Sequence, residues 1–272
     1  MIVDPHVHVW VNDPAYPWPA ENADPPKRDH TVEMLLDIMA THGVDRAVLV
    51  HAIHYRWDNR YAVDSANKYP DRFMSVGRID PEDPEAPDHL SRWTEECGMH
   101  GVRISPAGDA SGDWFSGPLM EPLFARAEEL QVPMLLWTKA NRLAELIPLL
   151  ERHPDLDVVI DHMGHVQGAE ETKLLLNLAR FPRLYVKISH LYFFSGAEYP
   201  WAGAHALVQK VYDTFGAQRL MWDSDWPVSL SAAEYGQTLS AVRDEMGFIS
   251  SEDMPWILGK TAMKLWDFKG RG

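Results

Sequence analysis

The chain has 272 residues, a length that fits one large domain, and its hydrophobic fraction of 46% excludes a disordered protein. Forty acidic residues against 25 basic ones give a formal net charge of −15, which disfavours nucleic acids and anionic membrane surfaces as partners. The single cysteine excludes a disulfide framework, and without a signal-peptide pattern or an apolar run of about 18 residues we expect a cytoplasmic protein with no membrane span.

Short apolar segments alternate with helical patterns along the whole chain. Segments such as AVLV and PMLLW are continuously hydrophobic, which is typical of parallel strands buried on both faces. The predicted strands are residues 2–9, 47–51, 73–78, 101–104, 133–137, 158–162, 184–189 and 220–225.

Helical patterns fill the intervals between these strands. In residues 31–42 the apolar side chains recur at helical spacing, and the helix should end at Gly43. The remaining predicted helices are residues 58–69, 87–97, 119–130, 141–152, 169–180, 202–215 and 232–246. A strand followed by a helix, eight times, predicts an α/β fold of the (β/α)8 TIM-barrel type. A doubly wound open sheet is the alternative, but the chain has no glycine before Gly43 for the glycine-rich first turn of that fold.

The domain organisation follows from the evenness of the sequence. No composition break, low-complexity tract or internal repeat divides the chain, so we expect a single barrel domain over residues 1–272. Residues 11–30 form a proline-rich segment too long for a simple connection, and we expect a lid or rim loop there. Residues 105–117, rich in glycine and proline, are a second candidate rim loop.

Histidines and an aspartate follow the ends of several predicted strands, where a barrel places its functional groups. His6 and His8 alternate on one face of the first strand, His162 ends the sixth strand and Asp225 ends the eighth. Each has an ordinary structural explanation by itself, such as a core histidine or an aspartate that caps a helix. Because all four converge at one barrel mouth, we predict that they form a site with metal-ligand chemistry.

Other polar and aromatic side chains at strand ends are candidates for substrate binding. Arg103 is expected to bind an anionic group, because a basic group at the mouth of so acidic a protein requires a counter-anion. The further candidates are His51, Arg78, Trp137 and Lys187. Arg78 and Arg103 could instead be ion-pair partners inside the barrel, Lys187 could neutralise Asp225, and Trp137 could be a packing residue.

Three more residues near the strand ends have open roles. His165 is a candidate rim group. Asp223 shares a face with Asp225 and could support it or act as an alternative ligand. Asp161 should point away from His162 and bond outside the barrel.

Four segments, DPHVHVW, VVIDHMGH, YVKIS and RLMWDSDWP, resemble the amidohydrolase superfamily, and the resemblance runs the full length of the chain. The most similar branch is the amidohydrolase-2 or lactonase-like group, which includes pyrone-dicarboxylate and sugar-acid lactonases. The resemblance implies a distorted (β/α)8 barrel with His6, His8, His162 and Asp225 at its mouth. It also implies that Asp225 is the general base and that Arg103 grips a substrate carboxylate.

The chain departs from the family pattern in two places. Binuclear members need a bridging lysine or glutamate on the fourth strand and histidines that end strands five and six. Here the fourth strand ends in Arg103 and the fifth ends LLWT, so a two-metal site is not expected. Lys187 stands where the pyrone-dicarboxylate lactonase has an arginine, which weakens the case for a dicarboxylate substrate.

We predict one divalent metal ion, Zn²⁺ or Mn²⁺, bound by His6, His8, His162 and Asp225. The alternative is no metal, because lactonases that resemble this chain work without one and use the histidines to hydrogen-bond the substrate carbonyl.

The predicted function is that of a hydrolase, a lactonase that opens a small carboxylated or hydroxylated lactone with Asp225 and His162 as catalytic residues. One alternative is a metal-dependent non-oxidative decarboxylase of an aromatic or dienoic acid. The other is a barrel that has lost catalysis and acts as a binding protein. The expected partner is a small anionic or polar lactone, and a homo-oligomer stays open.

Overall fold

The structure, a computed structural model, describes residues 1–20, 22, 24–105, 114–195 and 198–268. The eight predicted strands are confirmed, and all of their pairings are parallel. The strands are β1 (Val3–Val7), β2 (Arg46–Val50), β3 (Phe73–Val76), β4 (Val102–Ile104), β5 (Met134–Leu136), β6 (Val158–Ile160), β7 (Leu184–Ile188) and β8 (Leu220–Trp222).

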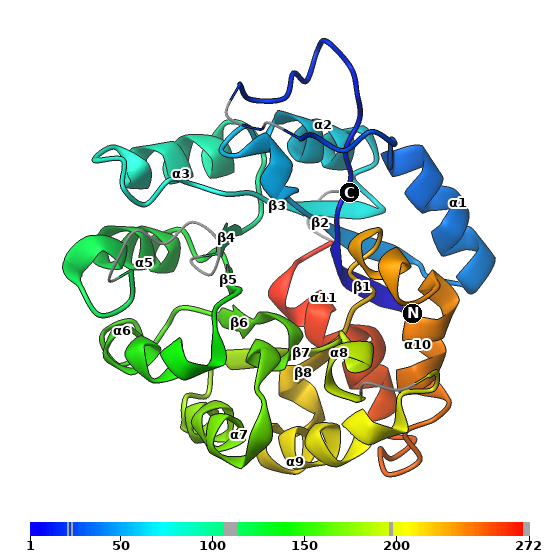
Figure 1. Ribbon diagram of the computed structural model, residues 1–272. Helices are drawn as coiled ribbons and strands as arrows, with labels where there is room; N and C mark the ends of the chain where they lie inside the picture. Colours follow the sequence, from blue (N-terminus) through cyan, green and yellow to red (C-terminus); the bar gives the residue numbers. More distant parts are fainter. Residues whose placement is uncertain (21, 23, 106–113, 196–197, 269–272) are drawn as a thin grey trace.

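The strands form a ring with helices outside it, as Figure 1 shows. Hydrogen bonds order them as β1-β2-β3 and as β4-β5-β6-β7-β8. Single bridges from Gly77 to Val102 and from Val7 to Trp226 join the two sheets at both seams. Glycine is required at Gly77, because a Cβ there would collide with the side chains of Met99 and Asn59. The predicted (β/α)8 barrel is confirmed.

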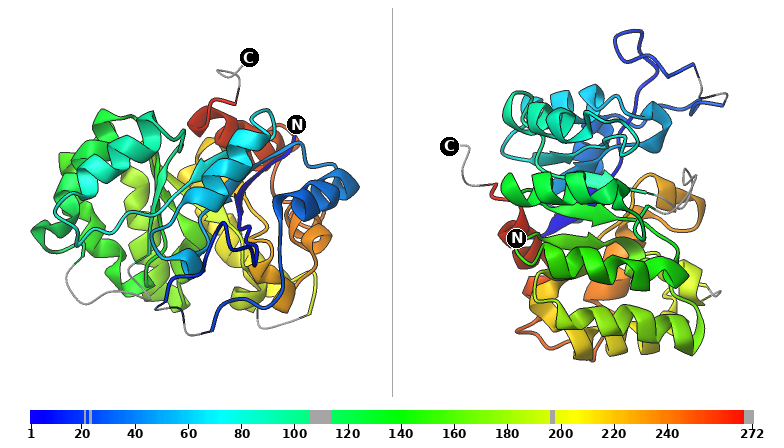
Figure 2. Two further views of the ribbon diagram at one scale, coloured as in Figure 1. Left: turned by 90° about the horizontal axis from the view of Figure 1, so that it is seen from above. Right: turned by 90° about the vertical axis from the view of Figure 1, so that its left-hand side faces the viewer.

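The α-helices surround the strands, as the two further views in Figure 2 also show. They are α1 (Val32–His42), α2 (Arg60–Lys68), α3 (Ala86–Glu95), α5 (Glu121–Glu129), α6 (Ile147–Arg152), α7 (Gly168–Asn177), α8 (Leu191–Ser195), α9 (His205–Phe215), α10 (Tyr235–Arg243) and α11 (Thr261–Leu265). Helix α1 ends as predicted, with Gly43 in the left-handed conformation and its N–H directed at Ala40 and Met39 carbonyls. Helices α8 and α11 were not predicted from the sequence.

Short helical segments of other types connect these elements. The predicted helix at 141–152 is a 3₁₀ segment followed by α6, whose Pro148 stands in its first turn. The 3₁₀ segments are η1 (Ile53–Tyr55), η2 (Pro118–Met120), η3 (Ala140–Leu146), η4 (Asp161–His165), η5 (Leu178–Arg180), η6 (Ala202–Ala204), η7 (Ala217–Arg219) and η8 (Val228–Ser231), and η9 (Trp256–Lys260) is a π-helix.

Strand alternation divides the hydrophobic core into two parts. On β2, Leu49 belongs to the cluster between strands and helices, whereas Val48 belongs to a smaller cluster inside the barrel. This inner cluster also contains Trp266 and Phe268, which follow α11. The C-terminal segment therefore closes the amino end of the barrel, and polar side chains occupy the other end.

The described residues of the proline-rich loop at 11–30 pack beside the barrel mouth. Trp10 and His30 pair at its two ends, and Trp18 stacks on Tyr55 with ring centroids 4.3 Å apart. Residues 106–113 of the second expected rim loop lie outside the described residues. In the part of the chain that the structure describes, no helix has the length and apolar character to cross a bilayer.

We expect Trp266→Ala to lower the free energy of unfolding by about 3–5 kcal/mol, because it empties a large volume at the closed end of the barrel. Urea unfolding measures this change. The matched control is Trp256→Ala in the same C-terminal segment, which removes a partly buried indole and should cost only about 1 kcal/mol. Equal losses in the two variants would contradict the closing role of Trp266.

Candidate active site

A cavity of about 250 Å³ opens at the carboxyl ends of the strands. Its walls combine ionisable side chains with aromatic and aliphatic ones, as small-molecule sites do. The lining residues are His8, Trp10, Ala52, Ile53, His54, Arg103, Trp137, His162, His190, Asp225 and Val228.

The pairing of the first strand is irregular near its two histidines. The register between β1 and β2 shifts between Asp4 and Val7, the kind of bulge that redirects side chains next to active sites. The His6 carbonyl accepts a hydrogen bond of 3.0 Å from the Asp225 N–H, and the His8 N–H donates to the Trp226 carbonyl at 2.7 Å. The end of β1 is therefore held against the segment that follows β8.

His8 and Asp225 face each other across the cavity floor. Nδ1 of His8 lies 2.8 Å from the Val50 carbonyl oxygen, and a carbonyl only accepts, so Nδ1 carries the hydrogen. In the neutral ring this leaves a lone pair on Nε2, which lies 3.1 Å from Oδ1 of Asp225.

Asp225 receives a chain of hydrogen bonds with one direction. The Trp137 indole donates to Nδ1 of His165 at 3.4 Å, and His165 then donates from Nε2 to Nδ1 of His190 at 2.9 Å. His190 donates from Nε2 to Oδ2 of Asp225 at 2.6 Å. The direction is set because an indole only donates and a carboxylate only accepts.

The protonation state of Asp225 follows from these contacts. Burial alone would raise its pKa, but the hydrogen bond from His190 holds the pKa well below the ordinary value. Asp225 is therefore a carboxylate at neutral pH. Its Oδ1 makes no hydrogen bond of good geometry among the described residues and is available as a base.

Three strand ends reach the cavity through backbone in the left-handed region. The φ angles are 51° at His162, 54° at His190 and 50° at Asp225. Such conformations are uncommon outside glycine and cost on the order of 1–3 kcal/mol each. All three side chains line the cavity, so the strained positions coincide with the candidate site.

His162 lies between a hydroxyl and a second imidazole. Its Nδ1 lies 2.7 Å from Oγ of Ser189, and its ring stacks on His190 with centroids 3.8 Å apart. Burial, followed by the nearby His190, lowers the pKa of His162 well below 6.5. His162 is therefore a neutral imidazole at physiological pH, able to act as a ligand or as a hydrogen-bond donor.

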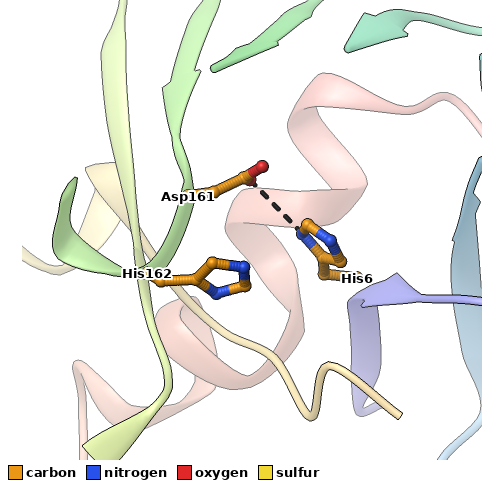
Figure 3. A group of neighbouring side chains, drawn as sticks. All are labelled: His6, Asp161 and His162. Atoms are coloured by element: carbon orange, nitrogen blue, oxygen red, sulfur yellow. Dashed lines mark ion pairs between the residues drawn. The ribbon is translucent and has the colours of Figure 1, made fainter. Parts of the chain in front are cut away.

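Beneath the cavity the barrel interior holds a group of buried charges. Asp161 accepts a hydrogen bond of 2.9 Å from Nε of Arg103, and its Oδ1 lies 3.0 Å from Nζ of Lys187 and 3.3 Å from Nδ1 of His6. Figure 3 shows the carboxylate directed at His6, with His162 beside it. Burial alone would raise the pKa of Asp161, but Lys187 and Arg103 hold it well below its ordinary value.

The expectation that Asp161 bonds outside the barrel is wrong. Alternation from Val159, an inner residue of β6, also directs Asp161 inward. His162 would then point outward, but its positive φ breaks the alternation and returns its ring to the cavity.

The structure places five of the nine predicted site residues in the cavity wall and the other four outside the wall. His8, Arg103, His162, Asp225 and Trp137 line the cavity, whereas His6 and Lys187 lie beneath it. The other two lie elsewhere: Nε2 of His51 faces the Arg56 carbonyl at 2.9 Å, and the guanidinium of Arg78 lies 4.7 Å from the Trp57 ring centroid.

His190 is the main residue absent from the predicted site. It follows β7 directly, so the strand-end rule could have singled it out. Alternation from Lys187 places Ser189 rather than His190 on the inner face, and only the positive φ of His190 turns its ring toward Asp225.

Within the part of the chain that the structure describes, three overlapping groups of side chains have ligand atoms within 4.8 Å of one another and could hold a metal ion. The groups are His6, Asp161 and His162; His6, His8 and Asp225; and His162, His190 and Asp225. Asp225 belongs to two of these groups.

Known proteins resemble this chain over most of its length. A family model described as amidohydrolase matches residues 3–268. The L-fucono-1,5-lactonase of Burkholderia ambifaria is 30% identical over 243 residues, which cover 86% of this chain and 83% of that protein. The L-fucono-1,5-lactonase of Burkholderia multivorans is 26% identical over 296 residues, which cover 97% of this chain and 95% of that protein.

Solved structures share the same architecture. A Pseudomonas putida protein named as a 2-pyrone-4,6-dicarboxylic acid hydrolase superposes with a TM-score of 0.84 at 26% identity and covers 98% of both chains. A protein of the same name from Acinetobacter baumannii, with citric acid bound, gives a TM-score of 0.82 at 21% identity, with 97% of this chain and 98% of that one covered.

We expect the stability of the fold to decrease between pH 7 and pH 5, and His165→Gln to make that decrease smaller. Burial, followed by His190, lowers the pKa of His165 from 6.5 to about 4. The neutral folded form therefore stabilises the protein fully above about pH 6.5, and this contribution is lost as the pH falls toward 4. Urea unfolding at both pH values measures the difference.

The control is His89→Gln, which changes a partly exposed histidine on α3 that lies beside Asp83 and far from the cavity. The pH dependence of this variant should match that of the unmodified protein. A His165→Gln variant with an unchanged pH dependence would show that His165 is not buried as a neutral ring.

Proposed function

The chain belongs to the amidohydrolase family, and we propose that it is a hydrolase that opens small hydroxylated lactones by water attack. The observation that carries the proposal is Asp225, a buried carboxylate that lines the cavity and whose Oδ1 has no hydrogen-bond partner among the described residues. We further propose that the barrel works as one domain. We also propose that it cleaves the ester bond of a lactone ring, the class of bond that the names of its relatives indicate.

The cavity fits a single small ring. Its volume is about 250 Å³, and the indoles of Trp10 and Trp137, together with Ile53 and Val228, give it flat and apolar walls. Such walls pack against the C–H faces of a lactone, while polar groups at the floor bind its oxygens.

Arg103 contributes hydrogen-bond donors more than net charge. Its Nε is held by Asp161 at 2.9 Å, so the buried carboxylate offsets the positive charge. The terminal amino groups of Arg103 have no hydrogen-bond partner among the described residues, and we propose that they bind the oxygens of a substrate at the cavity wall. With Lys187 also engaged by Asp161, the charge balance favours a hydroxylated lactone over a dicarboxylate.

In the proposed reaction a water molecule beside Asp225 attacks the lactone carbonyl. Oδ1 of Asp225 takes a proton from the water as the new C–O bond forms, and the carbonyl oxygen becomes an oxyanion. The imidazole of His162 is placed at the cavity wall to bind that oxygen. When the ring C–O bond breaks, Asp225 returns the proton to the leaving alkoxide, which gives the open hydroxy acid.

One divalent ion, zinc or manganese, fits the donor set of His8 and Asp225, with His162 close by. Both atoms can donate an electron pair to a metal ion. Nε2 of His8 bears a lone pair because Nδ1 donates a hydrogen bond to the Val50 carbonyl, and Oδ1 of Asp225 lacks a hydrogen-bond partner among the described residues. When bound, such an ion supplies Lewis-acid polarisation of the carbonyl. His6 has a different environment, because its Nδ1 lies 2.8 Å from Nζ of Lys187.

We expect Asp225→Asn to reduce lactone hydrolysis by about 10²–10⁴-fold, because an amide cannot accept the proton from water. Initial rates on L-fucono-1,5-lactone, related aldonolactones and 2-pyrone-4,6-dicarboxylate, read with a pH indicator, measure the loss. The control is Asp253→Asn, since Asp253 binds the Tyr212 hydroxyl at 2.6 Å away from the cavity. Near-normal turnover in the Asp225 variant, or CO₂ release from benzoates without lactone opening, would refute the proposal.

We expect the protein, purified without chelator or added metal, to contain about one equivalent of a divalent ion by elemental analysis. His8→Ala should lose that ion, because it removes the ligand whose lone pair is fixed by Val50. His89→Ala, at a histidine on α3 remote from the cavity, should retain it. An active preparation without metal would show that His8 and His162 bind the substrate oxygens directly.

A further inference from the structure

Lys187 is buried directly behind His6 and contacts it. The side chain of Lys187 is fully buried, and its Nζ lies 2.8 Å from Nδ1 of His6 and 3.0 Å from Oδ1 of Asp161. Asp161 supplies the negative charge that an ammonium needs in the barrel interior. Lys187 does not line the cavity, so its nearest functional neighbour is the imidazole of His6.

This contact determines where His6 carries its hydrogen. An ammonium has three donors and no acceptor, so Lys187 must donate to Nδ1 of His6. A neutral imidazole has one N–H and one lone pair, so the hydrogen of His6 stands on Nε2. His8 is the opposite case, because its Nδ1 donates to the Val50 carbonyl and its lone pair is on Nε2.

The Nε2 of His6 lies close to Asp225, the proposed base of the reaction. It is buried, makes no hydrogen bond with the described residues and lies 3.7 Å from Oδ1 of Asp225. An unpaired buried donor and an unpaired buried acceptor therefore face a common point. A water molecule at that point could accept a hydrogen bond from His6 and donate one to Asp225.

We propose that Lys187 is a positioning residue that fixes His6 as the Nε2–H tautomer, so that His6 serves as a hydrogen-bond donor to the attacking water rather than as a metal ligand. The catalytic part of this inference rests on the proposed hydrolase function, whereas the tautomer does not. Lys187 acts through His6, and Asp161 keeps Lys187 in place. The two histidines of the first strand then have different roles: Nε2 of His8 offers a lone pair, whereas Nε2 of His6 donates a hydrogen bond.

The tautomer can be read directly from long-range ¹H–¹⁵N spectra of the whole protein with labelled histidine. The His6 signals are assigned by their loss in His6→Gln. We expect Nε2 to be the protonated nitrogen in the unmodified protein. A hydrogen on Nδ1 would overturn the proposal without any variant, and this result is independent of which substrate the enzyme uses.

Lys187→Met should move the hydrogen of His6 to Nδ1 and strengthen zinc binding. Without the ammonium, Nδ1 of His6 can donate to Oδ1 of Asp161, which is 3.3 Å away, and Nε2 gains a lone pair. We therefore expect zinc affinity to rise about tenfold, while kcat falls about tenfold and KM changes little. A structural defect alone would weaken zinc binding instead.

Two further variants complete the experiment. Lys187→Arg keeps a side chain that only donates and should retain the Nε2–H signal. Lys264→Met, which removes a lysine packed over the Tyr185 ring on β7, should leave the His6 tautomer, zinc affinity and kcat unchanged. An Nε2–H signal that persists in Lys187→Met refutes the role of Lys187, whereas a correct tautomer with no lactonase activity refutes only the proposed function.

Discussion

The buried ion pairs of Asp161 with Arg103 and Lys187 are the interactions on which the cavity end of the barrel depends. A carboxylate enclosed by strands is expensive unless cations pair with it, and Arg103 and Lys187 supply the two contacts. Each cation then has a second task, because Arg103 reaches the cavity wall and Lys187 reaches His6. One buried charge therefore orients both the substrate-facing guanidinium and an imidazole beneath the site.

The second constraint is the junction between the two ends of the chain. Asp4 accepts hydrogen bonds from the Ser224 N–H at 3.1 Å and from the Tyr235 hydroxyl at 2.9 Å, and burial raises its pKa to about 6. The His6 carbonyl accepts from the Asp225 N–H in the same region. The first strand and the segment after the last strand thus form one unit. That junction is why histidines near residue 6 and an aspartate near residue 225 share a cavity.

Sequence patterns predicted the barrel and most of the cavity wall, because strand periodicity and strand ends are local signals. All eight strands lie where hydrophobic runs placed them, and the side chains that follow them gather at one mouth. Alternation holds from Val159 to Asp161 but breaks at the left-handed backbone of His162 and His190. Counting from His162 therefore places Asp161 on the wrong side, and counting from Lys187 does not select His190. That Asp161 pairs with Lys187 and Arg103 could not be derived either, since a strand end does not reveal which of its neighbours carries the opposite charge.

The hydrogen-bond directions in the site are determined by the groups at which each chain of bonds ends. The indole of Trp137 only donates, so the bonds through His165 and His190 all run toward Asp225. An ammonium likewise only donates, so the bond from Lys187 also runs toward the site. The bonds through His190 end at Oδ2 of Asp225, whereas Oδ1 has no hydrogen-bond partner among the described residues, and Nε2 of His6 lies 3.7 Å from it. A carboxylate in that position can accept one more hydrogen bond, and a water molecule about to attack is a donor that can supply it.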